Sequence, residues 1–174
     1  DKMLPGFLEK AMFSIAQYPQ AGLCCSDFIT FDGATGVARN HKLYLSDKPC
    51  YFSPEQLLEI ILKRPINAMP IYSPTCVMKH SALIEAGGFL PELGNYTDWF
   101  THLVIGFRYG ICYFPELSAA QRMLPNSYHQ TQQRNFDGQI EILNNLLQLL
   151  DTPTYIDVKP YFQRSTSLSN NPTH

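Results

Sequence analysis

The stretch Glu85-Ala-Gly-Gly-Phe-Leu-Pro-Glu-Leu-Gly-Asn-Tyr-Thr-Asp-Trp99 joins two predicted helices and decides how the chain around it folds. The first helix covers residues 80–86 and ends at Gly87 and Gly88, because glycine accepts the left-handed backbone that stops a helix. Residues 91–95 then form an irregular loop, as their proline, glycine and asparagine indicate. The stretch therefore predicts a helix, a short loop and a second helix.

The second helix carries the residue that we single out for chemistry. It begins at Thr97, has apolar residues at helical spacing and ends at Gly110. Asp98 thus falls in the first turn, where backbone N–H groups and the helix dipole favour an ionised carboxylate. Such a carboxylate can accept a proton from a ligand held against the loop; in the simpler interpretation Asp98 only starts the helix.

Composition excludes several classes of protein. The chain has 174 residues, of which 45% are hydrophobic and 13% aromatic, enough for one domain with a core and too many for a disordered chain. A net charge of -2 gives no general attraction to nucleic acid or anionic membranes. No apolar run approaches the ~20 residues that span a bilayer.

The cysteines are odd in number and lack the spacing of metal ligands. Two of them are adjacent inside a predicted strand, where alternation turns their side chains to opposite faces. This usage predicts buried, reduced thiols in a cytoplasmic protein, and no zinc site. The five residues are Cys24, Cys25, Cys50, Cys76 and Cys112.

Helices and strands alternate along the rest of the chain, which indicates the α/β class. Ser53 and Gln56 have the spacing of a helix cap, and Ser73-Pro74 interrupts a strand, which predicts an edge or a bulge there. The apolar patterns predict helices at 5–17, 53–64 and 137–150, and strands at 20–31, 37–45, 69–78, 111–114 and 117–123.

An apolar strand, a helix ending in Gly-Gly-Phe, a short loop and Asp-Trp opening a helix together resemble the C-terminal half of the GT-A glycosyltransferases of sequence family 2. In that family the aspartate is the catalytic base that deprotonates the acceptor hydroxyl, and Asp98 is the matching position. Thr97 and Phe100 stand where the family often has acidic residues, so the details of the acceptor do not carry over. The resemblance implies an acceptor site at Gly87, Gly88, Phe89 and Trp99.

Residues 1–10 resemble the segment that follows the Asp-x-Asp motif of the same family. There the acidic motif binds the divalent cation, Mg²⁺ or Mn²⁺, that bridges the diphosphate of the donor. Asp1 is either a ligand of that ion or the residue after the ligands. One carboxylate cannot make such a site without partners.

The segment from Pro115-Glu116 to Arg122, Pro125 and Ser127 resembles the family's ending. Leu124 stands where a histidine is frequent, so the role of that histidine does not carry over. Arg122 is either a partner for a phosphate or the acceptor, which makes it the candidate cofactor-binding residue, or a member of a surface ion pair.

The resemblance implies a partial GT-A α/β/α sandwich with a mixed sheet, lacking the N-terminal nucleotide-binding half. Residues 1–150 would form its acceptor side, and 151–174 an extended segment with a flexible tail from 165. The implied reaction is inverting transfer of a sugar from a nucleotide-diphospho-sugar to a glycan or lipid-linked acceptor hydroxyl, in polysaccharide biosynthesis for the cell envelope. This chain would be inactive alone, in the cytoplasm or at the inner face of the membrane.

One alternative function stays open at this point: a non-catalytic module that binds a saccharide or holds an assembly together, through exposed aromatic residues and its leucine-rich helix. That helix, 137–150, has a clear apolar stripe, which either packs on its own domain or forms a homodimer.

Overall fold

Two long parallel strands, β2 (Leu23–Asp32) and β6 (Ile111–Met123), form the centre of the fold. They pair from Leu23 opposite Ile111 to Asp32 opposite Met123. The computed structural model describes residues 1–64, 70–124 and 136–167.

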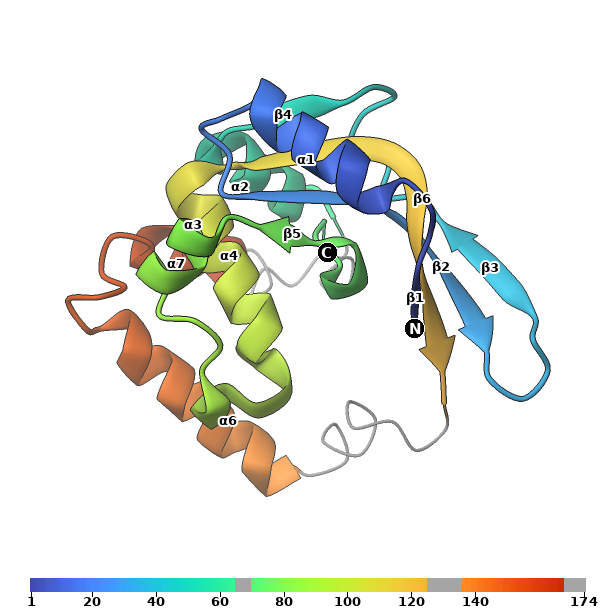
Figure 1. The fold of residues 1–174 in the computed structure, drawn as a ribbon. Coiled ribbons are helices and arrows are strands. Elements are labelled where there is room, and N and C mark those ends of the chain that lie inside the picture. The colour runs from blue at the N-terminus through green and yellow to red at the C-terminus, as the bar shows by residue number, and fades with distance from the viewer. Residues whose placement is uncertain (65–69, 125–135, 168–174) are drawn as a thin grey trace, which may run out of the picture.

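Each central strand has two short antiparallel neighbours along its outer edge. β1 (Lys2–Met3) and β4 (Cys50–Phe52) pair with β6, and β3 (Ala38–His41) and β5 (Val77–Met78) pair with β2 (Figure 1). The result is a mixed, open sheet of six strands. It confirms the predicted α/β class and the mixed sheet.

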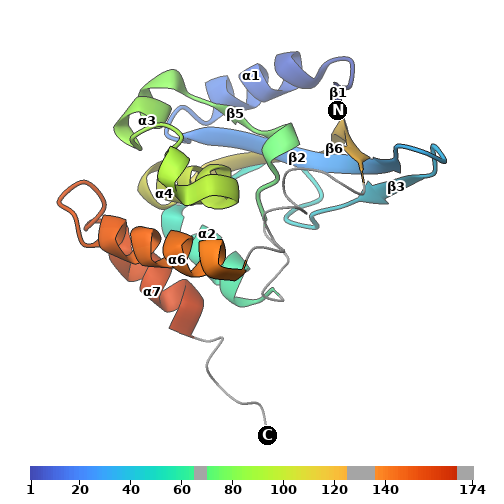
Figure 2. The same ribbon diagram turned by 90° about the horizontal axis from the view of Figure 1, so that it is seen from below.

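Helices cover both faces of this sheet, as Figure 2 shows. On one face α1 (Phe7–Gln17) buries Phe7 and Ala11 against Cys24 and Phe114 of the central strands. The larger core lies on the opposite face. Four helices form it, namely α2 (Pro54–Leu62), α4 (Thr97–Tyr109), α6 (Phe136–Leu150) and α7 (Lys159–Ser167).

Three short helices complete the connections, namely η1 (Ser73–Thr75), α3 (His80–Glu85) and η2 (Pro91–Tyr96). The helices predicted from the opening stretch are confirmed as α3 and α4, and the loop between them is the 3-10 helix η2. The predicted cap of α2 is also confirmed. The Ser53 hydroxyl accepts from the Gln56 N–H at 3.3 Å, and the Ser53 N–H donates to the Gln56 side chain at 2.9 Å.

Several strand predictions were wrong in extent; within 37–45, only Ala38–His41 is a strand. The segments 111–114 and 117–123 are one strand, because Pro115 and Glu116 bulge out and pairing with β2 continues beyond them. A bulge tolerates a proline, which has no N–H to donate to a ladder. Within 69–78, only Val77–Met78 is a strand, because Ser73–Thr75 form the 3-10 helix η1; residue 69 lies outside the described part.

The C-terminal segment corrects another prediction. Instead of running extended, residues 159–167 form α7, and the segment around it buries Tyr155, Val158 and Phe162 in the larger core. Tyr155 and Phe162 both pack on Phe100 of α4. Residues 168–174, the rest of the predicted tail, lie outside the described residues.

Helix α6 packs on its own domain through Ile142, Leu146 and Leu150. A second stripe, Ile140, Leu143 and Leu147, is about half exposed. The homodimer through this helix stays a prediction. In the part of the chain that the structure describes, no helix has the length and apolar character needed to cross a bilayer.

Candidate active site

Asp98 lies where the sequence placed it, in the first turn of α4. Gly94 bends the preceding 3-10 helix with a φ of 50°, which most other residues resist, and the chain then enters α4 at Thr97. The Asp98 Oδ1 accepts from the N–H of Trp99 at 2.7 Å, one of the N–H groups that a helix start leaves without an internal partner. The other oxygen, Oδ2, accepts from the Ser73 hydroxyl. Asp98 is half-buried.

Burial favours the neutral forms of three titratable side chains beside Asp98. Burial, with a smaller contribution from the charge of Asp98, raises the pKa of the Cys76 thiol and of the Tyr72 phenol. Burial lowers the pKa of His102, against the opposing effect of Asp98 one helical turn away. Asp98 makes no salt bridge with any cation that the structure describes. A carboxylate without a counter-ion is suited to accept a proton.

A polar and aromatic surface connects Asp98 to the sheet. The Tyr72 hydroxyl donates to the Gln121 side chain on β6, and the Tyr72 ring stacks on Phe28 of β2 at 3.7 Å between ring centroids. Phe28 in turn stacks on His41 at 4.7 Å, and the His41 ring and the Thr30 hydroxyl lie 2.7 Å apart. Sequence analysis missed these residues.

Asp1 and Arg122, the two predicted donor-side residues, are neighbours. Because β1 runs antiparallel along β6 with Lys2 opposite Ala120, residue 1 reaches Arg122, and its Oδ1 accepts from the Arg122 N–H at 2.7 Å. Arg122 follows Gln121, which binds Tyr72. A chain of contacts thus links Asp98, through Ser73 and the residues just named, to Asp1.

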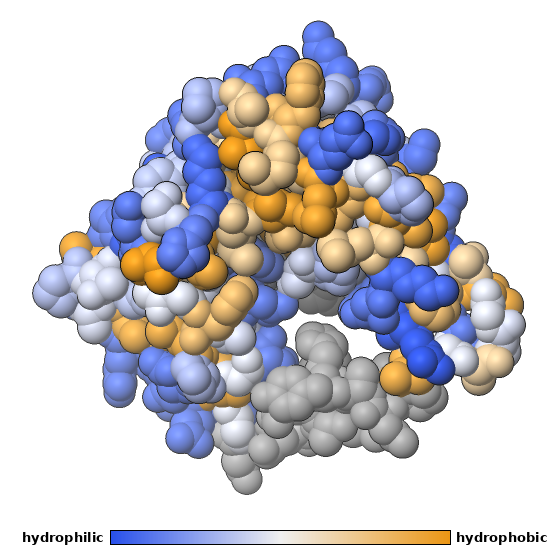
Figure 3. All heavy atoms as spheres, in the orientation of Figure 1, coloured by the Kyte–Doolittle hydropathy of each residue, from blue (hydrophilic) through white to orange (hydrophobic). Residues whose placement is uncertain are grey.

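This chain of contacts lies toward the carboxyl ends of the parallel strands β2 and β6. Ligands of open α/β sheets bind at that edge. Figure 3 shows the surface hollowed between the N-terminal end of α4 and this edge of the sheet.

The side chains of Gln121 and Arg122 lie on opposite faces of the sheet. Thr30 pairs with Gln121 and Phe31 with Arg122, so alternation turns the Arg122 side chain away from the face that carries Gln121 and Tyr72. The Arg122 side chain is exposed and forms no salt bridge with a carboxylate in the described ranges. The predicted phosphate contact stays a prediction.

Asp1 does not make a metal site with its described neighbours. No group of three His, Cys, Asp or Glu side chains in 1–64, 70–124 and 136–167 could hold a metal ion. The nearest polar partner of Asp1 is a backbone N–H, which a cation would repel. The predicted Mg²⁺ or Mn²⁺ would need ligands beyond these residues.

Two of the predicted acceptor residues have packing contacts. A Cβ on Gly87 would meet the Tyr155 hydroxyl, which donates to the Ala86 carbonyl at 3.1 Å, so Gly87 leaves room for that hydrogen bond. The Trp99 ring packs edge-on against Phe162 of α7 at 5.8 Å.

The other two lie beside the first turns of α4. The Gly88 carbonyl accepts from the Thr101 hydroxyl at 2.8 Å, one turn along the helix from Asp98, and a Cβ on Gly88 would meet nothing within 4 Å. Phe89 is 48% exposed. Gly88 and Phe89 therefore have free space for a ligand.

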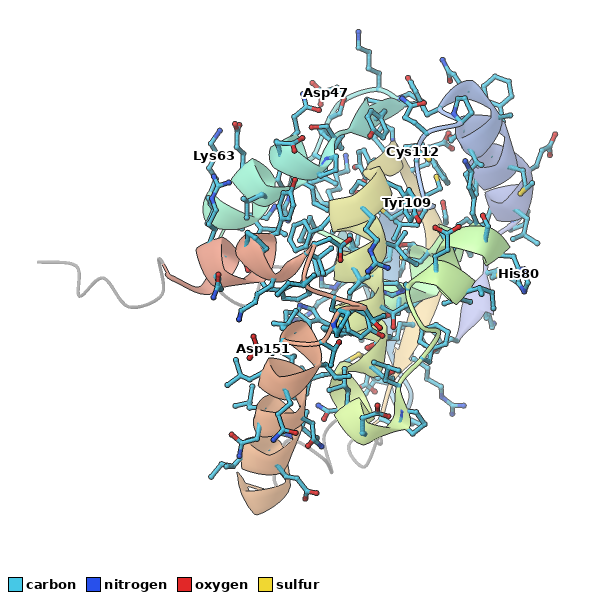
Figure 4. All side chains as sticks on the ribbon, turned by 90° about the vertical axis from the view of Figure 1, so that its left-hand side faces the viewer. Asp47, Lys63, His80, Tyr109, Cys112 and Asp151 are labelled. Atoms are coloured by element: carbon cyan, nitrogen blue, oxygen red, sulfur yellow. The ribbon has the colours of Figure 1, made fainter. Side chains whose placement is uncertain are left out.

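Hollows elsewhere on the surface do not involve Asp98. One of about 560 Å³ lies at the opposite end of α4, lined by Glu85, Phe107, Arg108, Tyr109, Asp157 and Tyr161. Tyr109 there lies near the start of β6 (Figure 4), and its hydroxyl is bonded to Glu85. The polar side chains that line this hollow bond to one another, as in the pairs Arg108–Asp157 and Tyr109–Glu85. This favours a structural role for the hollow.

The residues that sequence analysis missed left weak signals. Ser73-Pro74 was recognised as a break in a strand, and Gln121 stood next to Arg122. Only the fold brings Tyr72 and Gln121 together, since they are 49 residues apart.

Comparison of the chain with protein-family models, with curated proteins and with solved structures finds no match.

Proposed function

We propose that this chain forms the acceptor side of a GT-A glycosyltransferase of sequence family 2, with Asp98 as its catalytic base. The observation that carries the proposal is the state of Asp98. It is a half-buried carboxylate, held by two hydrogen bonds, without a counter-ion among the described residues, beside the carboxyl ends of two parallel strands.

The proposed reaction moves one proton to this chain. Asp98 takes the proton of the acceptor hydroxyl while that oxygen bonds to the anomeric carbon of the donor sugar. The bond between that carbon and the diphosphate oxygen breaks, and its electron pair leaves with the nucleoside diphosphate. Attack from the face opposite the leaving group inverts the anomeric configuration.

The fold and the order of the motifs support the GT-A part of the proposal. A mixed sheet with helices on both faces brings residues 1, 98 and 122, which are far apart in sequence, to one edge. The donor would be a nucleotide sugar and the acceptor a glycan or lipid-linked glycan, at the cytoplasmic side of the membrane. A divalent cation would neutralise the leaving diphosphate. Among the described residues, only Asp1 is a candidate ligand for that cation.

The test uses the full-length protein and the variant Asp98→Asn. The probes are UDP-glucose, UDP-galactose, UDP-N-acetylglucosamine and GDP-mannose with Mn²⁺ and a glycan mixture, and the readout is nucleoside diphosphate released. We expect one donor to turn over, and D98N to lose about 10²–10⁴-fold in rate, the usual contribution of a general base. Asparagine still accepts the Ser73 hydrogen bond, so the fold is kept.

Asp47 provides the matched control, because it is an exposed aspartate on the loop between β3 and β4 (Figure 4). Asp47→Asn makes the same chemical change and should keep the wild-type rate. Wild-type turnover by D98N would refute Asp98 as the base.

A saccharide-binding module is the second candidate, favoured by the exposed Phe89 and, separately, by the stacked rings of His41, Phe28 and Tyr72. It predicts that no donor in the panel turns over, while the protein binds glycans on an array. Binding would then be equal in wild type and D98N, which separates this candidate from the enzyme.

A further inference from the structure

We propose that Ser73 is a positioning residue, which holds the Asp98 carboxylate in the orientation that accepts the acceptor proton. This inference rests on the proposed function. Nothing in the sequence patterns pointed to Ser73 as more than a turn residue.

Two donors fix the two oxygens of Asp98. The Trp99 N–H binds Oδ1 at 2.7 Å from within α4, and the Ser73 hydroxyl binds Oδ2 from a different element. The Trp99 contact alone leaves the carboxylate free to rotate about it. The second contact fixes the plane of the group and leaves the remaining lone pairs of both oxygens for a ligand. Reaction rates are sensitive to such orientation.

The turn that carries Ser73 is itself well fixed. The Tyr72 carbonyl accepts from the N–H of Thr75 at 2.9 Å and from its hydroxyl at 2.8 Å, and the Ser73 carbonyl accepts from the Cys76 N–H at 3.1 Å. Thr75 is fully buried, and Pro74 restricts the backbone between them.

Tyr72 extends this support to the sheet. Its ring lies flat on Phe28, with 8° between the ring planes, and its hydroxyl is bonded to Gln121 on β6. The orientation of Asp98 is thereby set by the sheet as well as by its own helix. The same turn holds the base on one side and the carboxyl end of β6 on the other.

Ser73 is exposed, so its hydroxyl can be removed without a cavity. A purely structural role would show as lost stability, whereas a positioning role lowers kcat and leaves the donor KM and the stability unchanged. The two roles can therefore be separated.

The experiment compares Ser73→Ala, Ser73→Thr and the control Ser81→Ala in the full-length protein, with the donor that turns over. Ser81 is an exposed serine on α3. We expect S73A to lower kcat by about 10-fold with the donor KM unchanged, as for loss of one hydrogen bond to a charged group. S73T, which keeps the hydroxyl, should restore most of the rate, and S81A should match wild type.

A further variant tests whether the Tyr72 hydroxyl supports the turn that carries Ser73. Tyr72→Phe keeps the ring on Phe28 and removes the Gln121 hydrogen bond, so we expect a smaller fall in kcat, about 3-fold, in the same direction. A wild-type rate for Y72F would show that the Gln121 contact does not support the turn. The claim that the sheet helps to orient Asp98 would then be wrong.

The outcomes separate the two proposals. If D98N is inactive while S73A keeps the wild-type kcat, Asp98 remains the base and Ser73 does not position it. If S73A and S73T lose the rate equally, the hydroxyl is not responsible and the proposal for Ser73 is wrong. If D98N turns over normally, the proposed function fails, and Ser73 has no base to position.

Discussion

The two ends of α4 treat charged side chains in opposite ways. At the C-terminal end, Arg108 is 14% exposed and binds both oxygens of Asp157 at 2.8 and 3.0 Å, the Glu85 carbonyl at 2.6 Å and the Thr154 carbonyl. At the N-terminal end, Asp98 accepts two hydrogen bonds from neutral donors and meets no described cation. A charged group whose hydrogen-bonding positions are all occupied by the protein stabilises the fold. A charged group with unoccupied positions can also bind or react with a ligand.

The electrostatics follow the same division. The contact with Asp157 raises the pKa of Arg108 and lowers that of Asp157, so each ion favours the charge of the other. Around Asp98, burial keeps the neighbouring phenol, thiol and imidazole neutral. The helix dipole favours both arrangements, with an anion at its start and a cation at its end.

The largest expected effect tests the N-terminal end. Asp98→Asn should remove about 10²–10⁴-fold of activity and leave the free energy of unfolding within about 0.5 kcal/mol, because no ion pair is lost. Turnover and urea unfolding on the same sample check both halves. A large loss of stability in D98N would show that Asp98, like Arg108, mainly stabilises the fold. The two ends of α4 would then not differ in this respect.

The opposite end should show the reverse. Arg108→Met keeps most of the apolar stem and removes all four contacts, so we expect about 2 kcal/mol of destabilisation and a normal rate in the folded protein. Thermal unfolding should record a decrease of about 4–8 °C.

Lys63→Met is the control for this change, since Lys63 is an exposed cation at the C-terminal end of α2 with only a 3.7 Å pair to Glu59 (Figure 4). It should lie within about 0.5 kcal/mol of wild type. Equal stability of R108M and K63M would show that the contacts of Arg108 contribute nothing.

Gly87 and Gly88 offer the next smaller effect. Both have positive φ, of 85° and 75°, so alanine costs about 1 kcal/mol at either position. Gly87→Ala must also displace the Tyr155 hydroxyl, which adds roughly 1 kcal/mol, while Gly88→Ala meets open space. Urea unfolding should therefore rank G87A below G88A.

The activities of the two variants address the predicted acceptor site. G87A should keep the kcat/KM of the folded protein, because its contacts are internal. If Gly88 borders the acceptor, G88A lowers kcat/KM by steric contact beyond what its stability explains. An unchanged kcat/KM for G88A would leave Phe89 as the remaining candidate in this pair of positions.

Local patterns were enough to predict most of the elements. Ser53 and Gln56 close a capping box, and Gly87 and Gly110 end helices, because these roles depend on neighbours a few residues away. Asp98 was placed in a first turn for the same reason. Its neighbourhood was not predictable, because the Ser73 hydroxyl comes from an element 25 residues away.

The errors share a physical cause. Helix α7 is polar in composition and was predicted as an extended segment. It forms because Phe162 packs on Phe100 and Phe107 of α4, both at 5.4 Å, contacts that no local window contains. The strand β6 continues past Pro115 because β2 pairs with it on both sides of the bulge. Tertiary packing outweighs local propensity in both places.

The smallest expected effect concerns His102, which is 4% exposed and one turn from Asp98. Burial lowers its pKa in the folded state, so below the ordinary value of 6.5 the unfolded chain takes up a proton that the folded chain does not. Stability is thus fully present above pH 6.5 and decreases as the pH falls toward 5, by about 1 kcal/mol.

Urea unfolding at pH 7 and pH 5 measures the difference, and His102→Gln should reduce it. His80→Gln, at an exposed histidine on α3 (Figure 4), should not. If H102Q keeps the full wild-type difference, the acid sensitivity does not come from this end of α4. A reduced difference would instead show that His102, one helical turn from the proposed base, is buried as a neutral imidazole, which leaves Asp98 as the charged group of its cluster.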